Sequence, residues 1–516
     1  MGNNRFSKII TASVHGLDTD LVTVETDLTS GLPAFSLVGL PGSAVRESKE
    51  RVRAAIINSG YEFPLRRITV NLSPADTRKE GSHFDLPIAV GILAGMVKGK
   101  ILLPENGRSA FIGELSLDGE INRTDFAVAM VLGLQESGVT NIFLPDGNLR
   151  DVEELPGLFF YPAGALTEIV NHLLGGGEIP PVRGGIYGGR RPAQEAGEDD
   201  FIDVKGQEAV KRALVVSAAG AHDICLTGPP GVGKSMLAKR LPGILPLLTD
   251  SESREVTRIH SIAGERIEGR GLMSRRPFRT PHHSATQASI TGGGRMPRPG
   301  ELSLAHRGVL FLDELTEFDR RTLDMLRQPL EDRYIDLSRV GFKGRYPCDF
   351  LLVAAMNPCP CGYLGDPAHE CRCSQTQIQR YLSKLSGPLL DRIDIHIRMG
   401  GVEEAEFAVE TAETEGRPCM GTDRMREMVH AAREVQHSRN PARTLNARLS
   451  ADGIKRVCSM DKGAEEILKR AYEHYGFSVR ARSKIIKVAR TIADVAGEEG
   501  ISAAHIAEAV AYRVVV

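Results

Sequence analysis

The order of apolar and polar positions over residues 1–175 predicts a mixed α/β domain. Some segments alternate apolar and polar residues with a period of two, as half-buried strands do, and others have the longer pattern of helices. The predicted strands are 21–26, 35–38 and 67–72, and the predicted helices are 43–59, closed by Gly60, and 86–96.

The pattern changes in the second half of the chain. Short apolar runs are separated there by helical stretches, an alternation that is typical of a parallel sheet with crossover helices. After about residue 401 the pattern is helical. The predicted strands are 223–227, 309–312 and 350–355, and the later helices are 464–475, ended by Gly476, a helix capped by Ser478 and a helix that begins near Ser502.

Between the two regions lies a stretch that is rich in Gly and Pro and has almost no periodic apolar positions. Such a stretch cannot bury a core, so we expect a linker there. The expected organisation is a first domain over 1–175, a linker over 176–200, a second domain over 201–400 and a helical region over 401–516.

Composition and charge are those of an ordinary globular protein: 25% of the 516 residues are charged, 41% are hydrophobic, and the formal net charge is -2. A nucleic-acid partner would therefore have to contact a local basic patch. The N-terminal residues do not resemble a signal peptide, and the longest nearly apolar run, 86–97, is too short to span a bilayer. Eight cysteines in a chain of this length do not indicate a secreted disulfide scaffold. We expect a cytoplasmic protein with no membrane contact.

The strongest motif is GPPGVGKS at 228–235, which fits G-x-x-x-x-G-K-[ST] at every position. An apolar strand precedes it and a helix follows it, which argues against a chance Gly-rich turn. Its backbone N–H groups can approach phosphates closely, the lysine supplies a cation and the serine supplies an oxygen to Mg²⁺. The predicted ATP-binding residues are Gly228, Pro229, Pro230, Gly231, Val232, Gly233, Lys234 and Ser235.

A second motif is GVLFLDE at 308–314, in which a buried apolar strand ends in two acids. Asp313 is expected to hold Mg²⁺ and Glu314 to polarise the attacking water. An acidic pair alone is usually solvated surface. Its place after an apolar strand and downstream of a P-loop favours the catalytic interpretation.

Three further polar residues complete a set that resembles an AAA+ ATPase. Asn357 ends the strand FLLVAAMN and resembles sensor 1, a polar group near the γ-phosphate. Arg392 in SGPLLDRID resembles the arginine finger that enters a neighbour's site, and Arg480 in SVRA resembles sensor 2 of the lid. The alternatives are a strand-end turn residue for Asn357 and surface ion pairs for the arginines.

Longer runs make the resemblance more specific, because they are similar to the YifB/ComM family within the magnesium-chelatase-like branch of AAA+ proteins. They cover nearly the whole chain. The runs are FSLVGLPGSAVRESKERVRAAIINSG (35–60), VNLSPADTRKEGSHFDLPIAVGILA (70–94), PFRTPHHSAT (277–286), PGELSLAHRGVLFLDEL (299–315), MLRQPLEDR (325–333), AAMNPCPCG (354–362), SGPLLDRID (386–394) and KVARTIADVAG (487–497).

The resemblance implies an N-terminal domain of the ribosomal-S5/Lon-protease-like fold, an AAA+ core with a parallel sheet and a C-terminal helical lid. It also implies a hexameric ring and an association with DNA, since ComM proteins are linked to branch migration in natural transformation. A Lon-like fold raises the question of a Ser-Lys dyad. Ser82 is followed by bulky and acidic residues and has no convincing lysine partner, so we expect a scaffold or docking domain.

Two segments are candidates for contact with DNA. Between Arg254 and Arg298 there are nine arginines, no lysine and three glutamates, and the run TGGGRMPRPG would carry Arg295 and Arg298 on a loop. A second loop, GFKG at 341–344, would present Lys343 at the tip of a hairpin. A solvated basic surface or contacts between subunits would explain each of these residues equally well.

Four cysteines form two C-x-C pairs with nine residues between them: Cys359, Cys361, Cys371 and Cys373. Four thiolates so close in sequence fit a tetrahedral zinc site, although the usual knuckle is C-x₂-C. Reduced cysteines in a turn-rich loop are the alternative.

The leading interpretation is an ATPase that translocates or branch-migrates DNA. A chelatase-like or protein-remodelling motor without a DNA substrate is the first alternative, although the fused Lon-like domain argues against a chelatase. The second is a nucleotide-gated scaffold with little turnover, against which the intact Lys234, Asp313 and Glu314 argue.

Overall fold

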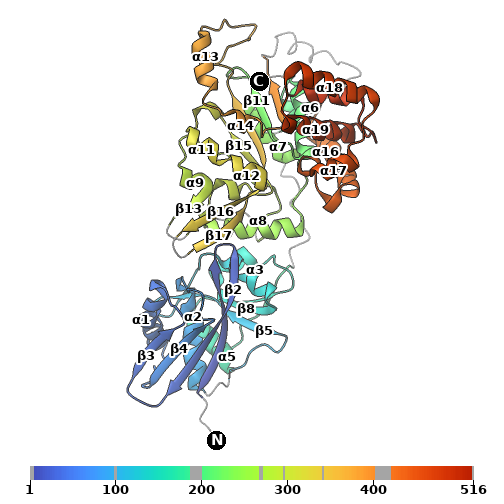
Figure 1. Cartoon of the computed structure of the whole chain (residues 1–516). Coiled ribbons are helices and arrows are strands. Elements are labelled where there is room, and N and C mark those ends of the chain that lie inside the picture. Colours follow the sequence, from blue (N-terminus) through green and yellow to red (C-terminus); the bar gives the residue numbers. More distant parts are fainter. Residues whose placement is uncertain are drawn as a thin grey trace. The chain divides into compact units, whose positions relative to one another are not determined.

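The computed structural model describes residues 5–97, 101–185, 200–265, 271–294, 297–339, 342–400 and 420–513. The chain divides into two compact units, coloured along the sequence in Figure 1. The first comprises Met1–Ala193 and Thr249–Ser274, and the second comprises Gln194–Leu248 and Arg275–Val516. The chain therefore leaves the second unit after Leu248 and re-enters it at Arg275.

The first unit is built on a mixed eight-stranded sheet with the strand order β10-β9-β8-β5-β1-β2-β4-β3. β2 pairs antiparallel with both β1 and β4, and β1, β5, β8 and β9 follow one another in parallel. The strands are β1 (Phe6–His15), β2 (Asp18–Thr29), β3 (Ala34–Val38), β4 (Arg67–Ser73), β5 (Arg108–Phe111), β8 (Val139–Pro145), β9 (Phe159–Ala163) and β10 (Val182–Arg183).

Helices cover both faces of this sheet. Successive residues of each strand point to opposite faces, so each strand contributes side chains to the core on either side. Ile9 and Val24 belong to the core beneath α1 (Ser43–Asn58) and α2 (Asp85–Met96). Ala12, on the opposite face, belongs to a separate core with α3 (Ala127–Glu136). The strands and helices predicted for this region are all present.

The second unit contains a five-stranded sheet in which all neighbouring strands run parallel. The order is β12-β15-β18-β11-β19. Since the carboxyl ends of parallel strands lie at the same edge, the loops after β11, β15 and β18 are neighbours in space. The strands are β11 (Ile224–Thr227), β12 (Phe278–Arg279), β15 (Val309–Leu312), β18 (Leu351–Met356) and β19 (Ile395–Arg398).

Every residue of β11, β15 and β18 is buried, which explains why these strands appear in the sequence as continuous apolar runs. One face packs against α6 (Glu208–Gly220), α7 (Lys234–Ile244) and the C-terminal helices, and the other against α10 (Glu301–Leu304), α11 (Arg320–Met325) and α12 (Arg327–Asp332). This is the predicted architecture of an α/β core with a parallel sheet.

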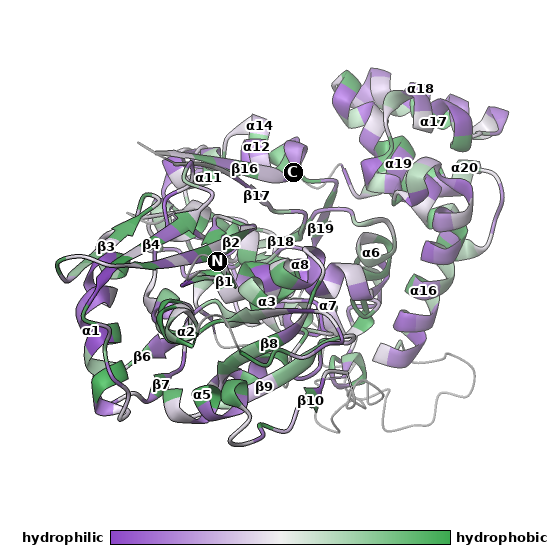
Figure 2. Cartoon of the chain, turned by 90° about the horizontal axis from the view of Figure 1, so that it is seen from below, coloured by the Kyte–Doolittle hydropathy of each residue, from purple (hydrophilic) through white to green (hydrophobic). Residues whose placement is uncertain are grey.

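The C-terminal region is helical, as predicted, and packs beside α6 (Figure 1). Its helices are capped where the sequence indicates: the Ser478 hydroxyl accepts the Ala481 N–H, and Gly476 adopts a left-handed conformation. Hydrophilic residues predominate along α16 in Figure 2. The helices are α16 (Thr422–Arg439), α17 (Ala451–Val457), α18 (Lys462–Tyr475), α19 (Val479–Ala496) and α20 (Ala503–Ala511).

The observed division differs from the expected domains in two places. β10 lies inside the stretch expected to be a linker, where Val182 pairs with Phe160 of β9. α8 (Asp250–Ala263) lies inside the expected second domain but packs on α3 of the first unit, where Arg254 donates to Gln135 at 2.7 Å. Neither feature has a local signal, because a two-residue edge strand and a helix docked on a distant helix depend on tertiary partners.

A buried ionic network joins α16 to α19. The Asp494 carboxylate accepts from Arg439 Nη2 at 2.9 Å, from Arg490 Nε at 3.1 Å and from Asn446 Nδ2 at 2.7 Å. The Arg490 side chain is fully buried and also donates to the carbonyls of Glu498 and Glu499. Removing one partner of such a group leaves an uncompensated charge in the interior.

We therefore expect Asp494→Ala to lower the free energy of unfolding by about 3–5 kcal/mol, measured by chemical denaturation. The matched control is Glu466→Ala, whose pair with Arg470 is exposed and should be worth less than about 0.5 kcal/mol. Equal effects of the two substitutions would show that the buried network does not stabilise the helical region.

Candidate functional site

The loop between β11 and α7 has the conformation that a phosphate-binding loop needs. Gly231 and Gly233 have φ of 80° and 89°, which favours glycine, and a Cβ at either position would meet nothing within 4 Å. Gly233 is the N-cap of α7 and supplies no side-chain acceptor, so the N–H groups of the first turn are open to an anion.

Lys234 joins this loop to the end of β18. Its Nζ donates to the carbonyls of Gly228 at 2.6 Å and Pro229 at 2.9 Å, and to Asn357 Oδ1 at 3.0 Å. Partial burial lowers the pKa of Lys234, and Asp313 and Glu314 act in the opposite direction. The structure thus brings together the predicted P-loop lysine and the predicted sensor 1 asparagine.

Ser235 meets the acidic end of β15. Its hydroxyl donates to Asp313 Oδ2 at 2.7 Å, and Asp313 Oδ1 accepts the backbone N–H of Glu314 at 2.9 Å. Mg²⁺ prefers one or two carboxylates together with phosphate oxygens and water. The hydroxyl–carboxylate pair fits Mg²⁺ bound with a nucleotide, because both oxygens lie next to the phosphate-binding loop.

The Glu314 carboxylate lies beside His283, which the sequence pattern placed only in the arginine-rich stretch. The Glu314 backbone is left-handed, with φ of 50°, and its carboxylate lies 3.6 Å from His283 Nδ1. His283 follows β12, the edge strand beside β15, and its ring lies edge-on to Phe318. The motif PFRTPHHSAT contained His283, but only the neighbouring strand shows which acid it faces.

Arg392 and Arg480 meet at one carboxylate, that of Glu331 in α12. Arg392 Nη2 lies 3.1 Å from Glu331 Oε2, and Arg480 Nη2 lies 2.7 Å from Glu331 Oε1. Arg392 also donates to the carbonyls of Arg327 at 3.0 Å and Pro388 at 2.7 Å. Their partners in the described part of the chain do not include the phosphate-binding loop, so the two arginines form a separate cluster.

The C-terminal helix α19 holds the backbone beside this cluster. Lys484 donates to the Arg392 carbonyl and to Asp394, and Asp394 accepts from His222 at 2.9 Å. Burial alone would raise the pKa of Asp394, but Lys484 and His222 hold it well below its usual range. His222 Nε2 lies 2.8 Å from the hydroxyl of Thr491, so the buried network ends on α19 again.

Four of the described arginines in the arginine-rich stretch are engaged within the chain. Arg258 pairs with Glu136, Arg276 donates to the Pro246 and Arg307 carbonyls at 2.6 and 2.7 Å, and Arg279 binds Glu301 at 2.7 Å. Arg254 is bonded to Gln135, as described above. Guanidinium groups that hold structural acceptors in this way are not placed for an outside phosphate.

Two hairpins carry the remaining DNA candidates. Arg298 is exposed in β14 (Arg298–Pro299), which pairs with β13 (Gly292–Gly293), and Arg295 lies outside the described residues. Lys343 lies in β17 (Phe342–Pro347), opposite Ser338 of β16 (Tyr334–Arg339), and not at the expected tip. The hairpins touch, since the Tyr346 hydroxyl donates to the Pro297 carbonyl at 2.8 Å.

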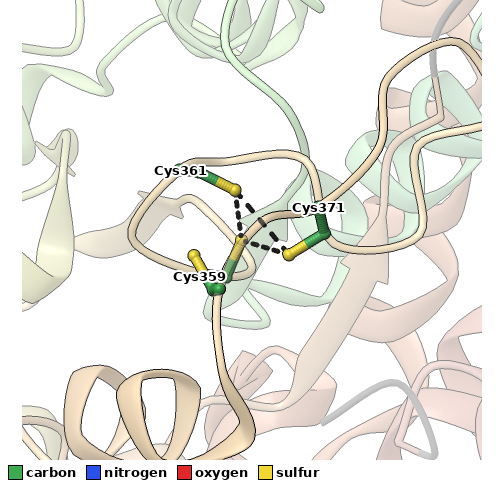
Figure 3. Close-up of side chains that lie close together, drawn as sticks. Cys359, Cys361 and Cys371 are labelled. Atoms are coloured by element: carbon green, nitrogen blue, oxygen red, sulfur yellow. Dashed lines mark hydrogen bonds between the residues drawn. The ribbon is translucent and has the colours of Figure 1, made fainter.

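The four cysteines converge after β18. The Sγ atoms of Cys359 and Cys361 lie 3.4 Å apart, and each lies 3.7 Å from that of Cys371 (Figure 3). All four sulfurs, including that of Cys373, lie within 4.8 Å of one another. A regular tetrahedron with zinc–sulfur bonds of about 2.3 Å has edges of about 3.8 Å, so the cluster is compatible with zinc.

In the first unit, Ser82 and Lys79 bond to other groups. The Ser82 hydroxyl donates to Glu114, and Lys79 Nζ donates to the carbonyls of Pro74 and, at 2.8 Å, Thr77. Among all the residues that the structure describes, no helix is both long and apolar enough to cross a membrane.

Family models match three segments of the chain. The family described as "Magnesium chelatase, subunit ChlI" matches residues 200–407. "Subunit ChlI of Mg-chelatase" matches residues 24–148, and "Magnesium chelatase, subunit ChlI C-terminal" matches residues 420–513. The first of these segments holds the phosphate-binding loop, the second holds part of the mixed sheet, and the third holds the C-terminal helices.

Two relatives are similar over nearly their full length, and a third is similar over a shorter segment. Competence protein ComM of Haemophilus influenzae is 40% identical over 502 residues, which cover 97% of this chain and 96% of that protein. The protein named YifB of Salmonella typhimurium is 40% identical over 513 residues, with coverage of 98% and 96%. The magnesium-chelatase 67 kDa subunit of Heliobacterium mobile is 28% identical over 235 residues, 40% of this chain and 32% of that protein.

The geometry predicts that Lys234→Ala weakens binding of a fluorescent ATP analogue by at least about tenfold, or about 1.4 kcal/mol, because it removes the cation beside the phosphates. Lys239→Ala is the matched control, since Lys239 is an exposed lysine of the same helix. Titration of both variants with the analogue in the presence of Mg²⁺ measures the effect. Similar affinities would contradict the assignment of Lys234.

Proposed function

Because the chain belongs to the YifB/ComM family of magnesium-chelatase-like AAA+ proteins, we propose that it is an ATPase that drives translocation along DNA or branch migration of DNA, as in recombination or natural transformation. The observation that carries the proposal is the meeting of Lys234, Ser235, Asp313 and Asn357 at the carboxyl edge of the parallel sheet. The relative named as a competence protein favours DNA as the substrate.

Each residue of the site has a distinct task in this proposal. Lys234 balances the charge of the β- and γ-phosphates, and Ser235 and Asp313 hold Mg²⁺, which neutralises phosphate charge when bound. Glu314 polarises the attacking water, and Asn357 orients that water from the end of β18. His283 lies beside the Glu314 carboxylate and holds it near the end of β15.

We assign Arg392 and Arg480 to the ATP site of a neighbouring copy in a hexameric ring. Their shared partner is Glu331, and their contacts in the described residues do not reach the chain's own P-loop. An arginine that approaches the γ-phosphate from a neighbour stabilises the charge of the transition state. Glu331 would keep both guanidinium groups together until phosphate replaces it as their partner.

Subunit mixing tests this assignment. Glu314→Gln subunits lack the catalytic carboxylate but still supply Arg392, and Arg392→Ala subunits have the reverse defect. Each variant alone should be inactive, and an equal mixture should recover roughly a quarter of the wild-type ATP turnover, because half of the subunits have a competent site and half of their neighbours supply the arginine.

The control mixture is Glu314→Gln with Lys234→Ala, in which every subunit is defective in its own site and activity should stay absent. A mixture of Glu314→Gln and Arg392→Ala that is no more active than the separate variants would show that Arg392 does not act on a neighbour.

For DNA, we propose the surface formed by the two touching hairpins, β13–β14 and β16–β17. The supporting observations are the Tyr346–Pro297 hydrogen bond that joins them and the basic residues Arg298 and Lys343 that they carry. Copies of this surface around a ring would contact the phosphate backbone without reading its sequence.

The expected result is that DNA raises the rate of ATP hydrolysis, and that Arg298→Ala with Lys343→Ala removes most of this increase because phosphate contacts are lost. The exposed Arg470 of α18 supplies the control, since Arg470→Ala should leave the increase intact. Hydrolysis rates with single-stranded, duplex and branched DNA at several salt concentrations measure it.

Equal rates with and without DNA in the unmutated protein would exclude DNA as the stimulating substrate. They would favour the second candidate, a chelatase-like or protein-remodelling motor. The observation behind that candidate is that all three matching family models are named for a magnesium-chelatase subunit.

We also propose that the four clustered cysteines bind one structural zinc ion. Zinc prefers four thiolates in a tetrahedron, and the measured sulfur separations are close to those of such a centre.

A further inference from the structure

The segment that follows β18, residues 357–362, packs against the phosphate-binding loop and forms a wall beside it. The Met356 carbonyl accepts the Gly228 N–H at 3.2 Å, and Asn357 Oδ1 accepts from Lys234 at 3.0 Å. A few residues later, Gly362 approaches Pro230 so closely that a Cβ on it would lie 2.6 Å from the proline Cδ. The loop and this segment therefore touch at three successive points.

Two of the four cysteines lie between the second and third of these contacts. Cys359 is fully buried and Cys361 is partly exposed, directly before Gly362. Cys371 and Cys373 lie near the end of the same loop, residues 357–374. The sulfur cluster therefore joins the wall of the nucleotide site to a segment about ten residues further on.

Few other interactions hold this loop in its conformation. Residues 365 and 367–370 are exposed, and residues 357–374 contain no helix or strand. The other contacts are mostly local to the loop. The rings of Tyr363 and His369 are tilted, with centroids 4.7 Å apart, and Asp366 accepts the Ala368 N–H at 2.8 Å and lies 3.3 Å from His369 Nδ1. Arg398 donates to the Leu364 carbonyl from outside the loop. Thiol–thiol contacts are weak, so a conformation that gathers four sulfurs needs a ligand to hold it.

We propose that zinc bound at Cys359, Cys361, Cys371 and Cys373 holds the segment 357–362 against the P-loop and thereby sets the affinity for ATP. The inference rests on the proposed ATP and zinc sites and adds the coupling between them. Loss of zinc releases Gly362 from Pro230 and Asn357 from Lys234, and the P-loop loses its wall on the β18 side.

The test uses the full chain and measures two quantities separately: zinc content by elemental analysis and affinity for a fluorescent ATP analogue. Wild-type protein should hold one zinc per chain. Cys371→Ser with Cys373→Ser should lower zinc to below about 0.1 per chain and weaken the affinity at least about tenfold. Glu370→Ala, an exposed substitution in the same loop, should change neither quantity.

A second variant disturbs the contact between Gly362 and Pro230 and leaves the four cysteines in place. Gly362→Ala keeps all four cysteines, and its added Cβ would collide with Pro230 at a residue whose φ is 87°. It should retain one zinc per chain, keep the tetrahedral thiolate absorption of a cobalt-substituted sample, and bind the ATP analogue more weakly than wild type. Retained affinity would show that the contact with Pro230 does not support the P-loop.

Removal of zinc from the wild-type chain avoids any question of misfolding in the variants. A zinc-selective chelator, with Mg²⁺ kept in excess, should weaken the affinity, and added Zn²⁺ should restore it. Unchanged affinity in the zinc-free protein would overturn the coupling and leave the proposed ATPase intact. A wild-type protein without zinc would overturn the metal site, and one that does not bind the analogue at all would overturn the proposed function itself.

Discussion

The parallel pairing of β11, β15 and β18 is the constraint on which the rest of the site depends. Because the three strands run in the same direction, their carboxyl ends supply Lys234 and Ser235, Asp313, and Asn357 to one small volume. No two of these strand ends are close in sequence. Their alignment requires the buried apolar faces of all three strands and the helices that cover them.

Two further elements are proposed to adjust this site: the segment after β18 and the arginine cluster at Glu331. The segment after β18 contains no helix or strand, and in the proposed coupling its shape depends on the sulfur cluster. The arginine cluster at Glu331 is linked to α19, because Arg480 belongs to this helix and Lys484 of the same helix binds Asp394 and the Arg392 carbonyl. A nucleotide site that needs both elements would respond to metal loading and to the arrangement of neighbouring copies.

Much of the fold and the centre of the site could be predicted from the sequence, because their signals are local. A Gly-rich run between an apolar strand and a helix specifies a P-loop, and the buried strand before Asp313 separates it from surface acids. Helix ends such as Ser478 and Gly476 were predicted for the same reason. The family resemblance is confirmed by relatives that match nearly the whole chain.

The features that could not be predicted depend on partners distant in sequence. Glu331 has no motif of its own, and only the fold brings it to Arg392 and Arg480. His283 was visible as part of a basic stretch, but its position beside Glu314 follows from the pairing of β12 with β15. Several arginines of that stretch fill structural roles that a count of charges cannot separate from nucleic-acid contacts.

The most direct measurement is a structure of the assembled protein with Mg²⁺ and a non-hydrolysable ATP analogue. We expect the γ-phosphate beside Lys234 and Asn357, Mg²⁺ beside Ser235 and Asp313, and Arg392 of an adjacent copy within hydrogen-bonding distance of that phosphate. An analogue bound elsewhere, or an Arg392 that remains on Glu331 of its own chain with the site fully occupied, would contradict this arrangement.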